Sequence, residues 1–333
     1  MIVRFTFMLL VALFAASAPA RAAAERLTIV GVDAQPTMQP LLDALRADMP
    51  HTKGQYRQAR PSQITSRLLA GVDDADPIDV LVLPTPDLAV YLANEGSVSR
   101  HGASAIKHRP QQQAHWRSEV FSIGYDPAVF VVRKGALAPS DVPRTRTELA
   151  RTLEQNRARL LRRVGLVNIG IDDVSYAFAS QEALRSPLFW RISRAVGASQ
   201  ARIFDSNEEL LQAMAEGRID IGYNVPLSAV RKWMRKTASI EMVIPEDYVL
   251  ALPWTALIPE KARNRSTAGD VVDFLLSDRA DRALEQVGLT RSRDLDTMKN
   301  VQFIELGPEL LVYLDAVKRS RFLDTWFQLV IQD

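Results

Sequence analysis

Residues 78–87 read Ile-Asp-Val-Leu-Val-Leu-Pro-Thr-Pro-Asp, and this stretch decides the fold class. The run from Ile78 to Leu83 has the length and the apolar composition of a buried strand. Two prolines end that strand, and residues 87–94 then have the pattern of a helix that Gly96 closes. A buried strand that turns at once into a helix is the repeating unit of α/β folds.

The same alternation continues on both sides of this stretch. The segments that read as strands are 27–31, 120–124, 128–132, 164–171, 219–223 and 248–258. Those that read as helices are 38–49, 63–69, 144–163, 207–215, 227–234, 268–276, 279–287 and 309–329. Strands that alternate with helices predict crossover connections and parallel pairing. We therefore predict an α/β protein of two lobes, each with a mostly parallel sheet, and a cleft between them.

The chain length sets the expected division into lobes. At 333 residues the chain is long enough for two domains of about 150 residues each. No Gly/Ser-rich linker separates them, so we expect strands to cross between the lobes at residues 128–133 and 248–258. The first lobe is then discontinuous, with residues 23–130 plus 250–333, and residues 131–249 form the second.

The first 22 residues have the pattern of a secretory signal peptide. Arg4 supplies the positive charge, an apolar run of about a dozen residues starts at Phe5, and Ala18, Ala20 and Ala22 fit a cleavage site. An N-terminal membrane anchor is the alternative, but the apolar run is shorter than the ~20 residues that a bilayer span needs. We expect a cleaved signal and a periplasmic protein.

Charge and cysteine content narrow the class further. The chain has 41 basic and 39 acidic residues, and losing Arg4 and Arg21 with the signal leaves it balanced. A balanced chain lacks the basic excess of nucleic-acid-binding proteins. The absence of cysteine excludes a lipoprotein anchor, a disulfide framework and a thiolate metal site. We expect a soluble monomer without a nucleic-acid partner.

The sequence contains no pattern of a catalytic or metal site that we recognise. It has no Gly-x-Ser-x-Gly nucleophile elbow, no His-Glu-x-x-His, and no phosphate- or dinucleotide-binding glycine pattern. Three of the four histidines, His101, His108 and His115, lie in one polar stretch that is typical of a solvated loop. We therefore predict a binding protein rather than an enzyme, with no cofactor and no metal.

Five segments, in order along the chain, resemble the extracellular solute-binding proteins of bacterial ABC importers, in particular the iron(III)-type branch of family 1. They are residues 78–87, 115–130, 216–224, 245–250 followed by 258–262, and 273–278. Relatives in that branch include sensor-associated members such as the phosphoglycerate transport regulatory protein. The resemblance implies a protein that captures a small solute between its lobes and delivers it to an ABC permease at the inner membrane. The alternative is a periplasmic solute-sensing accessory protein that signals to a two-component histidine kinase.

The sequence departs from this family at the strand ends. Pro84-Thr85 stands where the family usually has Ser-Ser, residues 172–175 replace a Ser-Gly element, and Val225-Pro226-Leu227 replaces small residues. Ferric sites of the family use adjacent tyrosines, whereas Tyr223 is followed by Asn224. These departures leave the identity and the charge of the solute open.

Ligands of open α/β sheets bind beyond the carboxyl ends of the strands, where helix N-termini offer free N–H groups. Four strand-to-helix junctions fit this description, at residues 33–38, 84–87, 171–176 and 223–226. Together with the pair that precedes the first crossover, they supply the predicted solute-binding residues Gln35, Thr37, Thr85, Tyr125, Asp126, Ser175, Tyr176, Tyr223 and Asn224.

Several residues at these junctions also have a structural alternative. Gln35 and Thr37 can serve a turn and a helix cap, and Tyr223 can be a packed core residue. The carboxylates of Asp87, Asp172 and Asp173 fit helix capping, because a side-chain oxygen there accepts from free backbone N–H groups. The arginines of residues 144–163 fit either a solvated helix face or a partner surface.

Overall fold

The computed structural model describes residues 25–70, 77–103, 114–295 and 298–332. The predicted signal peptide and His108 lie outside these ranges. The strands are β1 (Glu25–Gly31), β2 (Thr52–Gln58), β3 (Val80–Leu83), β4 (His115–Trp116), β5 (Val120–Arg133), β6 (Val164–Val167), β7 (Arg202–Phe204), β8 (Ile221–Pro226), β9 (Ile240–Val243), β10 (Val249–Leu257) and β11 (Val301–Phe303).

The α-helices are α1 (Gln35–Asp48), α2 (Pro61–Ala70), α3 (Pro86–Asn94), α5 (Arg146–Gln155), α6 (Asp173–Arg185), α7 (Leu188–Ala198), α8 (Asn207–Ala215), α9 (Leu227–Met234), α10 (Arg265–Leu276), α11 (Asp281–Val287), α12 (Ser292–Leu295) and α13 (Ala316–Val330). Short 3₁₀ helices are η2 (Pro139–Asp141), η3 (Asp278–Ala280) and η4 (Pro308–Tyr313). No helix among the described residues is long and apolar enough to cross a membrane.

One sheet runs through both halves of the molecule in the order β2-β1-β3-β10-β5-β8-β6-β7. The outer strands pair in parallel, β1 with β2 and β3, and β6 with β7 and β8. The central strands pair antiparallel, β10 with β3 and β5, and β5 with β8. This arrangement confirms the predicted α/β class, with crossing strands between two parallel groups.

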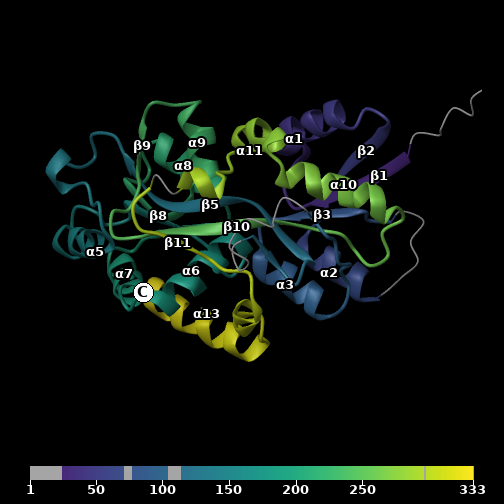
Figure 1. Cartoon of the computed structure of the whole chain (residues 1–333). Coiled ribbons are helices and arrows are strands. Elements are labelled where there is room, and N and C mark those ends of the chain that lie inside the picture. Colours follow the sequence, from purple (N-terminus) through teal and green to yellow (C-terminus); the bar gives the residue numbers. More distant parts are fainter. Residues whose placement is uncertain (1–24, 71–76, 104–113, 296–297, 333) are drawn as a thin grey trace, which may run out of the picture.

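The long strand β5 joins the two lobes. Its first part, Val120–Pro127, pairs with β10, and its second part, Ala128–Arg133, pairs with β8 and β9. The chain returns between β9 and β10, through residues 244–248, so the prediction that the strand over residues 248–258 makes this crossing is wrong. Figure 1 shows β5 and β10 passing through the middle of the molecule, with helices above and below them on each side. The predicted strands 120–124 and 128–132 are thus one continuous strand.

The last helix packs on the second lobe. Phe322, Trp326 and Val330 of α13 belong to the apolar cluster that α5, α7, β6 and β8 form. In Figure 1 α13 runs along the bottom of the molecule and ends beside α7. The expected lobe boundaries stay a prediction, but the packing groups α13 with the half that we expected from residues 131–249.

The predicted helix over residues 144–163 is too long. Only Arg146–Gln155 is helical, and the chain continues in turns to Arg163. The physical reason is that the arginines beyond the helix bond to carbonyls elsewhere: Arg157 donates to the Ala198 carbonyl at 2.7 Å, and Arg159 donates to the Ala136 carbonyl. These bonds hold residues 156–163 against the lobe in turns, although the periodicity of the sequence indicates a continuing helix.

Candidate functional site

A cavity of about 440 Å³ lies between the first two turns of α1 and one side of α9. Residues of both lobes line it: Asp33, Pro36, Thr37, Pro40, Glu208, Ser228, Ala229, Lys232, Arg235, Trp254, Gln286 and Val287. Because β1 and β8 lead into these two helices from opposite lobes, the cavity lies beyond the carboxyl ends of two strands, where α/β proteins bind ligands.

The loop that carries Asp33 is held from β2. The Tyr56 hydroxyl donates to the Asp33 carbonyl at 2.7 Å. Gly31 is required for this contact, because a Cβ at that position would lie 2.5 Å from the Tyr56 hydroxyl oxygen. Burial raises the pKa of Asp33 to about 6, and Lys232 across the cavity opposes this shift. The Asp33 carboxylate forms no hydrogen bond or ion pair with the described residues.

The N-terminus of α9 is fixed by a carboxylate from the crossing strand. Asp126 of β5 accepts from the Ser228 backbone N–H at 2.9 Å and from the Ser228 hydroxyl. Asp126 is buried, and burial raises its pKa to about 6, although both bonds from Ser228 lower it. This contact places the cavity side of α9 directly against the strand that joins the lobes.

The turn at the end of β8 contains a bulge. The register between β5 and β8 shifts between Val129 and Val131, and Asn224 takes a left-handed conformation with φ 55°. An asparagine tolerates this conformation better than most residues. The bulge turns the Asn224 amide toward the second lobe, where its Nδ2 donates to Glu182.

Glu182 belongs to a buried polar network that reaches the return crossing. Arg146, fully buried at the start of α5, donates to Glu182, to Asp247 at 3.1 Å and to the Tyr248 carbonyl at 2.7 Å. The guanidinium also lies 3.6 Å from the centre of the Tyr248 ring. This network thereby holds α5, α6, β8 and residues 244–248 to one another.

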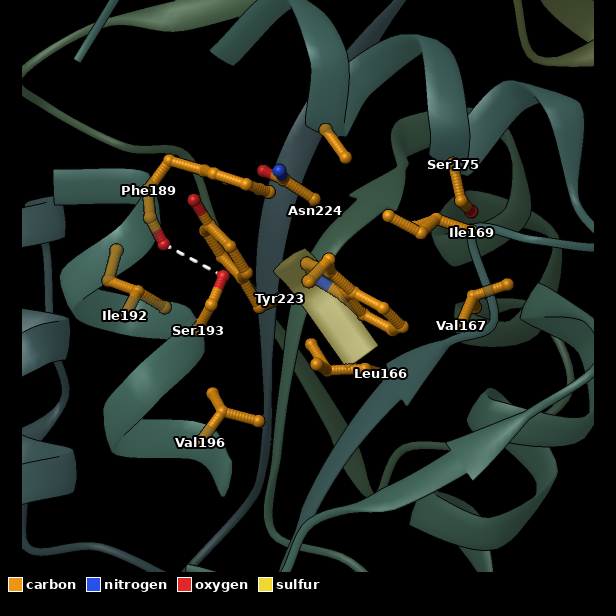
Figure 2. Close-up of a pocket in the computed structure, with 12 residues that line it drawn as sticks. Leu166, Val167, Ile169, Ser175, Phe189, Ile192, Ser193, Val196, Tyr223 and Asn224 are labelled. Atoms are coloured by element: carbon orange, nitrogen blue, oxygen red, sulfur yellow. Dashed lines mark hydrogen bonds between the residues drawn. The ribbon is translucent and has the colours of Figure 1, made fainter. Parts of the chain in front are cut away.

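A second cavity, of about 30 Å³, lies inside the second lobe (Figure 2). Ser175, Ser193, Tyr223 and Trp326 are among its lining residues, and the Ser193 hydroxyl donates to the Phe189 carbonyl at 2.9 Å. Burial and then Glu182 raise the pKa of Tyr223 well above its usual value, so its phenol stays protonated. The volume suits a guest of about the size of a water molecule. Of these two cavities, only the one of about 440 Å³ is large enough for an organic solute.

The junction between α3 and α6 is closed by packing. Val174, Ala177 and Phe178 of α6 lie in the same apolar cluster as Leu88 of α3. Within the described chain, the side-chain oxygens Thr85 Oγ1, Asp87 Oδ1 and Ser175 Oγ are buried there without a hydrogen-bond partner. Asp172 accepts from the Ser175 N–H at 2.6 Å, which confirms the capping alternative for this residue.

No group of three His, Cys, Asp or Glu side chains in the described ranges could hold a metal ion.

The profile of the bacterial extracellular solute-binding proteins matches residues 27–290. The chain belongs to this family. No curated protein matches the sequence.

Solved structures share the fold of this solute-binding protein. The substrate-binding protein of an ABC transporter from Agrobacterium tumefaciens has a TM-score of 0.82 at 23% identity, over 93% of this chain and 96% of that one. Iron-bound HitA from Pseudomonas aeruginosa has a TM-score of 0.69 at 15% identity, over 92% and 99%. The periplasmic binding protein AfuA from Actinobacillus pleuropneumoniae, with fructose-6-phosphate bound, has a TM-score of 0.69 at 14% identity, over 93% and 99%.

One of the predicted solute-binding residues lines the large cavity of this family member, and a second bonds to a residue that lines it. Thr37 lines it, and Asp126 reaches it through Ser228. Gln35 is exposed at the start of α1 and does not line the cavity.

The other predicted residues lie elsewhere. Ser175, Tyr223 and Asn224 line the small cavity, and Thr85 is buried just before α3. Tyr125 and Tyr176 are packed: the ring centres of Tyr125 and Phe303 lie 4.8 Å apart, and those of Tyr176 and Phe322 lie 5.8 Å apart. Contact of any of these residues with a solute stays a prediction.

The sequence-based list omits Asp33, Ser228 and Lys232, which line the large cavity. Asp33 starts the first predicted junction, so the rule that located Thr37 also points to it. Lys232 has no local signal, because a lysine on the polar side of a helix is usually solvated. Only the approach of α9 to α1 gives Lys232 a place in the site.

Proposed function

We propose that this protein captures a small solute in the large cavity between its lobes and delivers it to an ABC importer at the inner membrane. The observation that carries the proposal is the lining of that cavity, with Asp33 and Thr37 from one lobe and Ser228 and Lys232 from the other. A solute that contacts both lobes favours their closure about the crossing segments, and a permease can recognise the closed form.

The proposal includes export by cleavage near residue 22. Sequencing the N-terminus of the protein recovered from the periplasm tests it, and an intact Met1 would contradict it.

Thermal unfolding of the purified protein with a panel of solutes tests the binding. The panel covers organic acids, phosphorylated acids, sugars, polyamines, amino acids and ferric salts. A binding solute raises the unfolding temperature, and the cavity variant Thr37→Val should reduce the shift. Thr325→Val changes an exposed threonine of α13 and is the matched control. A shift that survives Thr37→Val and Trp254→Phe would place the site elsewhere.

Uptake by a deletion strain separates import from sensing. Loss of uptake of the identified solute supports the importer role. Normal uptake together with a lost transcriptional response to that solute would support signalling to a histidine kinase instead.

A further inference from the structure

We propose that the solute is a small zwitterion, with an amine held at Asp33 and an anionic group held at Lys232 and Arg235. This inference rests on the proposed function and names the class of solute for the same cavity.

The inner end of the cavity suits a cation. Asp33 is half-buried, and its carboxylate has no hydrogen-bond or ion-pair partner among the described residues. Two further carboxylates lie near it, because Asp172 raises the pKa of Asp33 and Asp33 raises the pKa of Asp126. These two carboxylates already cap α6 and α9, whereas the Asp33 carboxylate is available. A buried charge without a partner is costly, and an ammonium group would satisfy it.

The outer end suits an anion. Lys232 and Arg235 lie three residues apart at the end of α9, so their side chains share one helix face. Both line the cavity, and neither forms an ion pair with any residue that the structure describes. The neighbouring basic residues do have partners: Lys236 pairs with Glu208 at 3.4 Å, and Arg231 donates to the Thr290 hydroxyl at 3.3 Å. The two cations that face the cavity are the ones left for a ligand.

Part of the cavity lining is apolar. Trp254 forms part of its wall together with Pro36, Pro40 and Val287. This wall fits a short carbon chain between two charged ends. A plain cation would meet repulsion from Lys232 and Arg235, and a plain anion would meet repulsion from Asp33. A zwitterion satisfies both ends, and it binds one charge on each lobe.

Calorimetric titration with probes of equal length and different charge tests the inference. The probes are 5-aminovalerate, the diamine cadaverine and the dicarboxylate glutarate, with the homologues of three, four and six carbons in each series. We expect the best amino acid of this set to bind at least about tenfold more tightly than any diamine or dicarboxylate, because each of those loses one charged contact.

Variants assign the two ends. Asp33→Asn and Lys232→Gln should each weaken binding of the amino acid about tenfold. The controls Asp43→Asn and Lys318→Gln change exposed residues outside the cavity and should leave binding unchanged. Because Lys232 is exposed, its variant remains informative even where Asp33→Asn impairs folding.

The alternatives give different results. Tightest binding by a diamine, strengthened by Lys232→Gln, would overturn the zwitterion in favour of a cation. Tightest binding by a dicarboxylate, strengthened by Asp33→Asn, would overturn it in favour of an anion. Another solute that binds independently of both residues would also overturn it, but would leave the proposed function standing. If no solute of the wider panel binds the folded protein, the proposed function falls as well.

Discussion

At the residue scale, the charge on Asp33 controls how tightly the cavity binds an amine. Its pKa is raised to about 6 by burial, Lys232 lowers it, and Asp172 raises it; Tyr56 holds the same loop. An amine binds the ionised carboxylate, so affinity should be full above about pH 7 and fall as the pH drops through 6. At pH 5 we expect about tenfold weaker binding, because only about a tenth of a group with a pKa near 6 is then ionised.

Titration calorimetry between pH 5 and 8 measures this dependence. Asp33→Asn should bind weakly at every pH and depend less on pH than the unchanged protein, although Asp126, whose pKa is also about 6, still titrates in this range. Affinity that stays constant or increases on acidification would show that the Asp33 carboxylate does not receive the amine.

The Asp126 cap gives a second prediction at this scale. Asp126→Ala leaves the Ser228 N–H and hydroxyl without their acceptor, which should cost about 1–3 kcal/mol in urea unfolding. It should also weaken solute binding, because Ser228 and Lys232 lie on the helix that the cap positions.

Ser206→Ala is the matched control for the cap. Ser206 caps α8 by accepting from the Glu209 N–H at 3.2 Å, and it does not line the cavity. Its loss should cost about 1 kcal/mol of stability without changing affinity. Equal affinity of Asp126→Ala and the unchanged protein would argue against positioning of the site by the cap.

At the element scale, one buried arginine holds α5, α6 and the return crossing together. Arg146→Met leaves Glu182 buried without its main partner, and removing one member of a buried ion pair costs about 3–5 kcal/mol. The double variant Arg146→Met/Glu182→Leu removes both charges and should recover part of the loss. Urea unfolding of the three proteins tests this, and additive losses in the double variant would be the contrary result.

At the scale of the whole molecule, binding and folding are linked by mass action. A solute at one hundred times its dissociation constant should raise the free energy of unfolding by about 2.7 kcal/mol. Trp326→Ala, in α13, should lower stability by about 3–5 kcal/mol because it removes a buried ring from the second lobe.

The solute should raise the free energy of unfolding by the same amount in Trp326→Ala and in the unchanged protein, because Trp326 does not line the large cavity. Denaturation with and without solute measures both quantities. A smaller increment in Trp326→Ala would indicate that the packing of α13 is coupled to the solute site.

Local patterns in the sequence were sufficient for much of the fold. The strand and helix of residues 78–94, the stop at Gly96 with φ 71° and the cap at Asp172 all agree with the structure. These features depend on apolar runs, on single hydrogen bonds within one turn and on the freedom of glycine at positive φ, all of which a short segment contains.

Other features depend on segments far apart in the chain. The edge strand β2 has no fully buried residue, so it carries no strand pattern and forms by pairing with β1. Asp33 and Lys232 face one cavity only because the long strand β5 brings the two lobes together. The sequence by itself determined the family, the fold class and the strand-to-helix junctions. The tertiary structure decided which junctions stay open to a solute and which charges meet there, because packing between α3 and α6 closes one side while α1 and α9 stay apart on the other.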